Sequence, residues 1–260
     1  METNTSDVIR VSERHWHALV DDEVAGRGQV SRRPDGRAFV SVDAWQAGVF
    51  RRLAETMLAE LPRPLYTVVD EADLELLTAW ERFGFGPRRR EWEYVVPTSG
   101  GRVTPPPGVT VGPAEATSLQ RLYAVVRAEV EAGIGWQNMP AEVLTRPLEP
   151  ARYLVASMDG ESVGLTRLGP MPRRPHIGLI AVRSSHRGRG IGRAMLAEVL
   201  ADAHRCGVAT ASAEVNSANT AAVALFDGFG GRRAGSNLEL VLRGPLTGSE
   251  PRAALRGRHA

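Results

Sequence analysis

The residues best suited to chemistry form a glycine-rich run, Arg187-Gly188-Arg189-Gly190-Ile191-Gly192, between an apolar segment and an amphipathic one. This order predicts a strand, a loop and a helix, so several backbone amides gather at the N-terminus of the helix, where they can bind phosphate. Glycine lets the backbone approach an anion without an intervening Cβ atom. Arg187 or Arg189 can add charge-assisted hydrogen bonds to a pyrophosphate. The run therefore indicates a site for a nucleotide-like cofactor.

The spacing within this run argues against two other phosphate-binding loops. A dinucleotide-binding fold requires Gly-x-Gly-x-x-Gly, an order of glycines that the run lacks. A nucleoside-triphosphate loop requires Gly-Lys-Ser or Gly-Lys-Thr, and the chain contains no lysine, because its 32 basic residues are all arginine. An Arg- and Gly-rich turn without a ligand stays open as an alternative when the run is considered alone.

The composition, with 43% hydrophobic and 24% charged residues, is that of an ordinary globular protein. No apolar run approaches the ~20 residues of a membrane span or forms a secretory signal, so we expect a cytoplasmic protein. The 30 acidic residues lie among the arginines; this leaves no basic stripe for a nucleic acid, and we expect 88–90 to be a solvated edge. Cys206 has only His204 nearby, so we expect a buried thiol and no metal site.

Proline and glycine divide the chain of 260 residues into two halves. The stretch 98–107 is too rich in both residues to continue a helix or a central strand. It predicts a linker between a first domain at 1–97 and a second domain at 108–243. The polar stretch 244–260 lacks apolar periodicity and is predicted to be a flexible tail.

An internal repeat relates the two halves. Residues 18–26 align without gaps on 156–164, and each segment is an apolar run that turns at an acidic or Asp-Gly pair, which predicts a β-hairpin. Residues 73–85 align without gaps on 219–231. The repeat indicates that one ancestral unit was duplicated.

The apolar periodicity of the second half predicts a mixed α/β domain. We expect a helical region at 114–143, strands at 153–157, 163–168 and 177–182, a helix that begins at 191 and stops before Gly207, a strand at 209–215, a helix at 219–226 and a strand at 238–242.

Two blocks of the second half resemble motifs of the GNAT superfamily of N-acetyltransferases. The run at 187–192 is similar to the pyrophosphate loop of that family. The block at 214–226 is similar to the strand and helix that follow, which usually read Glu-Val…Asn…Ala…Leu-Tyr, and Gly230 stands at the expected later glycine. The resemblance covers about 108–243. With the repeat, it implies two GNAT-like halves, each a mixed central β-sheet flanked by helices.

The resemblance implies that acetyl-coenzyme A (acetyl-CoA) is the co-substrate. It places the backbone of Ile180, Ala181 and Val182 beside the pantetheine arm, like an extra strand, and the backbone amides of 187–192 on the pyrophosphate. Asn219 matches a residue that often contacts the cofactor. Phe226, in the helix of the second motif, belongs to the same cofactor-binding set.

The resemblance also implies a mechanism. Glu214 stands where similar enzymes, such as ribosomal-protein N-terminal acetyltransferases, place a glutamate that removes the amine proton. The alternative is a strand residue that faces solvent or pairs with an arginine. The usual general acid of the family is a tyrosine, but Phe226 at that position has no proton to donate. Tyr123 or Tyr153 could supply the proton, or could simply pack in the core.

In the family, the first helices build the acceptor pocket, which here corresponds to 114–143. This region contains Glu129, Glu131, Trp136 and Asn138. Its acidic residues would suit a cationic amine, although surface carboxylates on a helix are also common.

The first half is predicted to be a degenerate, noncatalytic GNAT-like domain. It has Gly48 but no Arg-x-x-Gly-x-Gly, and Val68 stands at the position of Glu214. We expect Trp45 and Phe50 to pack in the core or between the halves.

The sequence thus predicts an N-acetyltransferase that moves the acetyl group of acetyl-CoA to a primary amine of a small molecule or peptide. We expect no metal, nucleic-acid or membrane partner, and a homodimer is one option for its assembly. A noncatalytic acetyl-CoA-binding sensor is the alternative. A nucleic-acid-binding role for the arginines would instead predict steeply salt-dependent binding.

Overall fold

The computed structural model describes residues 7–33, 35–100, 103–135, 138, 148–169 and 175–244. The elements of the first half are, in chain order, β1 (Asp7–Ser12), β2 (His15–Val20), β3 (Glu23–Arg32), β4 (Ala38–Ala44), α1 (Ala47–Glu60), β5 (Leu65–Asp70), α2 (Leu74–Arg82) and β6 (Gly86–Pro97).

The second half begins after the predicted linker. Its elements are β7 (Val109–Pro113), α3 (Ala116–Gly133), β8 (Tyr153–Met158), β9 (Glu161–Leu168), β10 (His176–Val182), α5 (Ile191–Arg205), β11 (Thr210–Asn216), α6 (Thr220–Asp227) and β12 (Arg232–Leu242). The predicted elements are confirmed, with two differences. The last strand begins six residues earlier than expected, and α3 ends at Gly133, beyond which most of the predicted helical region lies outside the described residues.

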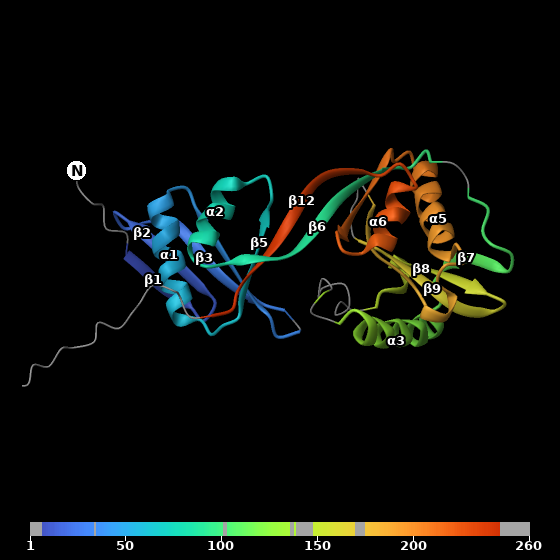
Figure 1. Cartoon of the computed structure of the whole chain (residues 1–260), viewed down its shortest axis with the longest axis horizontal. Coiled ribbons are helices and arrows are strands. Elements are labelled where there is room, and N and C mark those ends of the chain that lie inside the picture. Colours follow the sequence, from blue (N-terminus) through green and yellow to red (C-terminus); the bar gives the residue numbers. More distant parts are fainter. Residues whose placement is uncertain are drawn as a thin grey trace, which may run out of the picture.

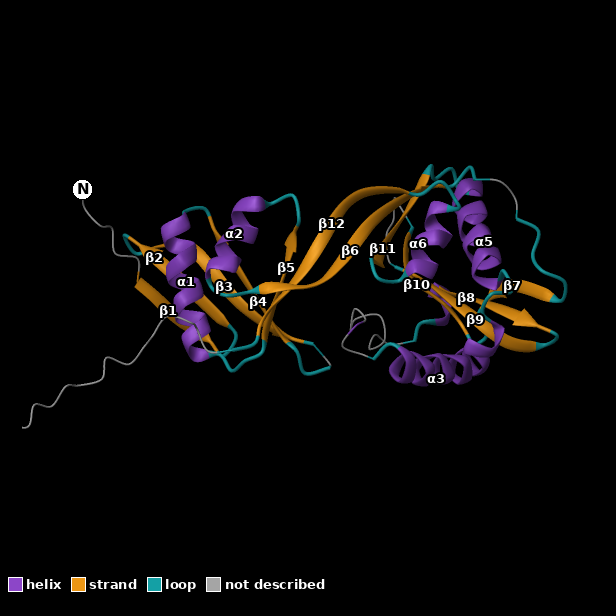
Figure 2. Cartoon of the chain, in the orientation of Figure 1, coloured by secondary structure: helices purple, strands orange, loops and turns teal. Residues whose placement is uncertain are grey.

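The twelve strands form one continuous mixed sheet, in the order β1-β2-β3-β4-β5-β12-β6-β11-β10-β9-β8-β7. Helices α1 and α2 flank the part of the sheet that comes from the first half (Figure 1). In the second half, α5 and α6 lie on one face and α3 lies on the other (Figure 2). Both halves therefore have the expected architecture, a mixed central sheet flanked by helices.

Both halves contain the same hairpin with the same irregularity. The turns Asp21-Asp22 and Asp159-Gly160 each place two consecutive residues at positive φ, between 52° and 84°, as a type I′ turn requires. In each hairpin the register then shifts by one residue, with Ala25 and Val163 as the extra residues. These two residues are equivalent in the aligned sequences, so the structure confirms the hairpins and supports the duplication.

The second aligned block gives two equivalent helix starts. Asp73 caps α2 and Asn219 caps α6, and each side chain accepts a hydrogen bond from the backbone N–H three residues later, at 3.0 and 3.1 Å. The two capping residues also have nearly identical backbone angles. Trp80 and Phe226, which are aligned in sequence, are both buried.

The last strand of each half crosses to the other half. Strand β6 pairs antiparallel with β11 from Glu91 to Pro97, and β12 pairs antiparallel with β5 from Asn237 to Leu242. The two crossing strands also pair with each other, and they run side by side between the halves (Figure 1). The sheet is continuous because the final strand of each half pairs with a strand of the other half.

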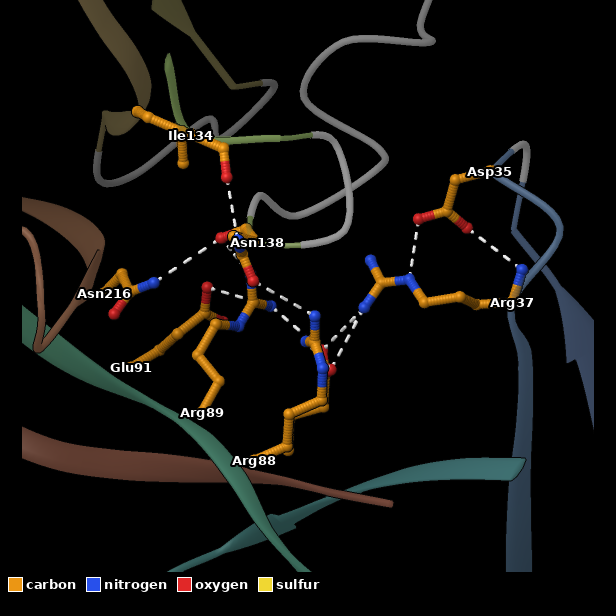
Figure 3. A network of polar contacts seen from close by, with 9 residues as sticks. Asp35, Arg37, Arg88, Arg89, Glu91, Ile134, Asn138 and Asn216 are labelled. Carbon is orange, nitrogen blue, oxygen red and sulfur yellow. Dashed lines mark hydrogen bonds and ion pairs between the residues drawn. The ribbon is translucent and has the colours of Figure 1, made fainter. Parts of the chain in front are cut away.

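A buried ion cluster lies where the strands cross (Figure 3). The side chain of Glu239 on β12 is 3% exposed and pairs with Arg37 at 3.0 Å, with Arg89 at 3.1 Å and with Arg88. The prediction that 88–90 forms a solvated edge is therefore wrong for Arg88 and Arg89, whose side chains are 12% and 7% exposed. A carboxylate from the end of the other half draws these arginines into the interior.

Two predictions of burial are also wrong. Phe50 is buried in the core, but Trp45 is 96% exposed in the connection between β4 and α1. Cys206 is exposed, because it follows the last turn of α5 and lies outside the apolar stripe that faces the sheet. None of the helices that the structure describes is long and apolar enough to cross a membrane.

Candidate active site

The strands β10 and β11 separate after a short parallel contact. Within the described residues, the two strands pair only at His176 with Ser212 and at Ile177 with Ala213. On its other side, β10 stays paired with β9 as far as Val182. The β11-facing edge of β10 beyond Ile177 therefore has no strand partner among the described residues, and an extended ligand can hydrogen-bond there as a strand would.

A β-bulge accompanies this separation. Ile177 faces Leu168 and Leu179 faces Arg167, so Gly178 is an extra residue on β10. A bulge bends its strand and increases the local twist, which suits a strand that diverges from its neighbour. The corresponding pairing of β3 with β4 in the first half is regular from Gly26 to Arg32.

The predicted pyrophosphate loop follows β10 directly. Gly188 and Gly190 adopt φ of +75° and +79°, and Gly190 is the N-cap of α5. No side chain caps this helix, so the N–H groups of its first turn, which begins at Ile191, have no acceptor within the helix. The loop is exposed from Arg187 to Gly190. Its shape and its free donors fit a diphosphate.

The two loop arginines differ in their contacts. The Arg187 Nε atom donates to the Val182 carbonyl at 3.1 Å, and Arg187 Nη2 lies 3.9 Å from Glu129 on α3. Glu129 also accepts from the Ser184 backbone N–H at 2.7 Å. Glu129 thus holds the loop in place. Arg189 is exposed and forms no hydrogen bond or ion pair with any described residue.

Of the other predicted cofactor residues, Ile180, Ala181 and Val182 lie along the open edge of β10. Asn219 caps α6 through its side-chain oxygen. Phe226 is buried, and its ring stacks on Tyr94 of β6 with centroids 5.5 Å apart. The structure thus brings the β10 residues together with the loop, and it places the ring of Phe226 in the core.

Glu214 lies on β11 close to the point of separation. Its neighbours Ala213 and Val215 are buried among residues of α5 and α6, so Glu214, which is exposed, faces the α3 side of the sheet. Glu93 of β6 is directly opposite it. The strand crossing therefore brings a carboxylate of the first half beside Glu214, a neighbour that no local sequence pattern predicts.

Glu91 adds a second carboxylate from β6. It pairs with Asn216 in the sheet, and its side chain forms an ion pair with Arg89 at 3.3 Å. Burial raises the pKa of Glu91, and the charge of Glu214 raises it further. The alternation of acidic and aromatic residues from Glu91 to Tyr94 is a signal for a two-faced strand, but nothing local indicates which strand pairs with it.

The residues expected in the acceptor pocket are dispersed. Asn138 accepts hydrogen bonds from Arg89 at 2.9 Å and from Asn216 at 3.5 Å through its carbonyl oxygen (Figure 3). Glu131 is exposed at the end of α3, and the predicted Trp136 lies outside the described residues. Among the expected residues that the structure describes, Asn138 is the one that hydrogen-bonds to β11.

Tyr123 and Tyr153 are both buried, and neither hydroxyl has a hydrogen-bond partner within the described part of the chain. Burial raises the pKa of both phenols. Tyr153 is on β8, so β9 and β10 separate it from the open edge. This position does not favour proton transfer to a leaving group held between β10 and β11.

Comparison with known proteins agrees with this geometry. Residues 121–230 match the model of the acetyltransferase (GNAT) family. These residues form a GNAT domain. The open edge of β10 and the loop at 187–192 both lie inside it, as does Glu214.

Solved structures resemble almost the whole chain. A GCN5-related N-acetyltransferase from Sphaerobacter thermophilus has a TM-score of 0.67 and 19% identity over 90% of this chain and 82% of its own. A tandem GNAT protein from the clavulanic acid biosynthesis pathway has a TM-score of 0.65 and 16% identity over 89% and 83%. An acetyltransferase of the GNAT family from Colwellia psychrerythraea has a TM-score of 0.63 and 15% identity over 88% and 85%.

These likenesses establish the fold, and the tandem protein shows that two GNAT-like halves occur together elsewhere. No curated protein matches this chain in sequence. Within the described residues, no group of three or more His, Cys, Asp or Glu side chains could hold a metal ion. The GNAT domain supports acetyl transfer as the general activity.

Proposed function

We propose that this chain is an acetyl-CoA-dependent N-acetyltransferase with one working site, in its second half. The acceptor is the primary amine of a small molecule or peptide. The observation that carries the proposal is the open edge of β10, which leads directly into the exposed glycine loop at the start of α5. In the first half β4 also pairs with β5 at only two positions, but its pairing with β3 has no bulge and its helix α1 follows Gln46 with negative φ. These differences favour the second half as the cofactor site.

The cofactor site divides into two parts. Ile180, Ala181 and Val182 would bind the pantetheine arm through their backbone groups. The amides of Arg187 to Gly192, with the side chain of Arg189, would bind the pyrophosphate. Asn219 remains a predicted contact.

The proposed reaction begins with a neutral amine held near Glu214. The amine nitrogen attacks the thioester carbonyl carbon, so a C–N bond forms, and Glu214 accepts the amine proton directly or through water. The C–S bond then breaks, and the departing thiolate takes a proton from solvent. A thiol pKa of about 8.5 makes this leaving group tolerable near neutral pH without a tyrosine acid.

The alternative is an acetyl-CoA sensor without catalysis. One specific observation favours it, because Phe226 replaces the usual tyrosine and its ring is buried against Tyr94. Such a protein would bind acetyl-CoA but would not release its thiol.

Release of coenzyme A thiol with a panel of amines tests the proposal. For Glu214→Gln we expect kcat to fall by about 10² to 10⁴, the range of general-base catalysis, with acetyl-CoA affinity changed by no more than about twofold. Glu198→Gln, on the exposed face of α5, is the matched control and should retain full activity.

Undiminished turnover in Glu214→Gln would remove Glu214 from the mechanism. Tight acetyl-CoA binding with no turnover of any amine would favour the sensor. Failure to bind acetyl-CoA would reject both functions.

A further inference from the structure

Arg167 on β9 is a buried arginine that has no carboxylate partner among the described residues. It is 6% exposed, and it forms no hydrogen bond or ion pair with any residue that the structure describes. Arg37, which is 8% exposed, shows the usual arrangement in this same chain, with Asp35 at 2.7 Å and Glu239 at 3.0 Å. A buried charge is costly unless it is paired. Within the described residues, Arg167 therefore has the unpaired guanidinium that a site for an anionic ligand requires.

Two further donors lie beside this guanidinium. The rings of Tyr123 and Tyr153 meet edge to face with centroids 6.5 Å apart. Both hydroxyls are buried without a partner in the described structure. Burial raises the pKa of each phenol, against the smaller opposing effect of the Arg167 charge, so both hydroxyls keep their protons at neutral pH. One guanidinium and two phenols offer several donors and no negative charge, which suits a carboxylate.

This group of donors lies next to the acyl-transfer centre. Arg167 is paired with Leu179 on the neighbouring strand β10. A Cβ atom added at Gly178 would lie 3.4 Å from Arg167 Nη1. The guanidinium thus already reaches β10 at the bulge. Leu165, two residues before Arg167 on β9, packs with α3, so Arg167 and Glu214 face the same side of the sheet.

The two side chains lie on the two strands that flank β10. Paired strands are about 4.8 Å apart, and Glu214 directly follows Ala213, the last residue of β11 that pairs with β10. A molecule whose reacting nitrogen lies near Glu214 can therefore place a carboxylate of its own at Arg167. So can an acyl group whose chain extends past the thioester carbonyl.

We propose that Arg167, Tyr123 and Tyr153 form a carboxylate-binding subsite beside the acyl-transfer centre. The inference rests on the proposed function. It narrows the substrates to those in which either the acceptor or the acyl-CoA carries a free carboxylate close to the reacting amine. The carboxylate belongs either to the acceptor, as in an amino acid, or to the acyl chain, as in a dicarboxylic acyl-CoA.

Matched acceptors test the first source. Glycine, β-alanine and 4-aminobutyrate are each compared with their amides in the thiol-release assay with acetyl-CoA. If the acceptor brings the carboxylate, at least one acid should exceed its amide by about tenfold or more in kcat/KM. Arg167→Met should reduce this preference to about unity, Arg167→Lys should keep part of it, and Arg121→Met on exposed α3 should leave it intact.

The second source is tested with the three amides as acceptors and succinyl-CoA in place of acetyl-CoA. If the acyl chain brings the carboxylate, succinyl-CoA should be preferred by about tenfold or more, and Arg167→Met should abolish that preference. The inference is overturned if neither carboxylate is preferred, or if Arg167→Met leaves the preference unchanged.

Thermal stability provides a test of the subsite that does not depend on turnover of any amine. Wild-type protein saturated with coenzyme A should gain thermal stability from one of the amino acids or from succinate, and Arg167→Met should gain none. Equal shifts in both proteins, or no shift in either, would overturn the subsite. The affinity of each variant for acetyl-CoA, measured by calorimetry, tests the proposed function separately, because Arg167 does not touch the loop at 187–192.

Discussion

The proposed cofactor site depends on single residues whose backbone angles are unusual. Gly188 and Gly190 adopt positive φ, which few other residues adopt without strain, and their types alone were enough to predict the loop. Glu93 and Arg167 could not be predicted in the same way. Their importance comes from the strands opposite them, and strand register is set by long-range packing rather than by local sequence.

The N-cap residue Glu115 allows a test of what stabilises α3, the helix whose Glu129 contacts the loop at 187–192. It caps α3, and its carboxylate accepts hydrogen bonds from the backbone N–H groups of Thr117 and Ser118, which lower its pKa to about 2. A lowered pKa stabilises the fold above the ordinary value of 4.5, and this contribution is lost as the pH falls from there toward about 2. In urea titrations, Glu115→Gln should therefore be less stable than wild type at pH 7, and the difference should shrink below pH 4.5. A difference independent of pH would contradict this account.

At the scale of elements, the sequence was informative where a pattern is local. The hairpins and the helices α5 and α6 followed from periodicity, turn residues and caps, and the duplicated bulges at Ala25 and Val163 agree with the repeat. The separation of β10 from β11 was available only through the resemblance, because periodicity does not reveal which strands pair or where they part.

The equivalent N-caps of α2 and α6 allow the capping role of Asn219 to be tested separately from its predicted contact with the cofactor. Asp and Asn are almost equivalent as N-caps, so Asn219→Asp should leave the free energy of unfolding within about 0.5 kcal/mol of wild type. If Asn219 also contacts the cofactor, as predicted, the new carboxylate should weaken acetyl-CoA binding by about tenfold. Asp73→Asn, at the equivalent cap of α2, is the control and should change neither quantity. Unchanged acetyl-CoA affinity in Asn219→Asp would remove Asn219 from the cofactor site.

At the scale of the whole molecule, the crossing of β6 and β12 makes the halves interdependent. A fragment cut at the predicted linker, 98–107, would take Glu93 away from Glu214. This exchange could not be predicted from the sequence, because a strand that ends one half has the same residue pattern whichever sheet it joins. The first half, which is predicted to be noncatalytic, therefore still supplies side chains to the face of the sheet that contains Glu214.

The ion cluster at the crossing tests this interdependence. Glu239 is 3% exposed among Arg37, Arg88 and Arg89, and removing one partner of a buried ion pair costs about 3–5 kcal/mol. We expect Glu239→Gln to lower the free energy of unfolding by that amount, measured by urea denaturation. Glu198→Gln, which removes an exposed pair with Arg205, should cost about 1 kcal/mol or less. Similar costs for the two variants would show that the crossing contributes little to stability.

The cofactor assignment is tested most directly by calorimetric titration of acetyl-CoA into Gly190→Asp and Gly207→Asp. Both glycines have positive φ, of +79° and +75°, so the two substitutions carry similar backbone strain, but only Gly190 lies in the loop at the start of α5. A carboxylate at Gly190 would face the pyrophosphate, and we expect the dissociation constant to rise at least about tenfold there and to stay within about twofold in Gly207→Asp. Equal affinity of the two variants and the wild type would contradict the account.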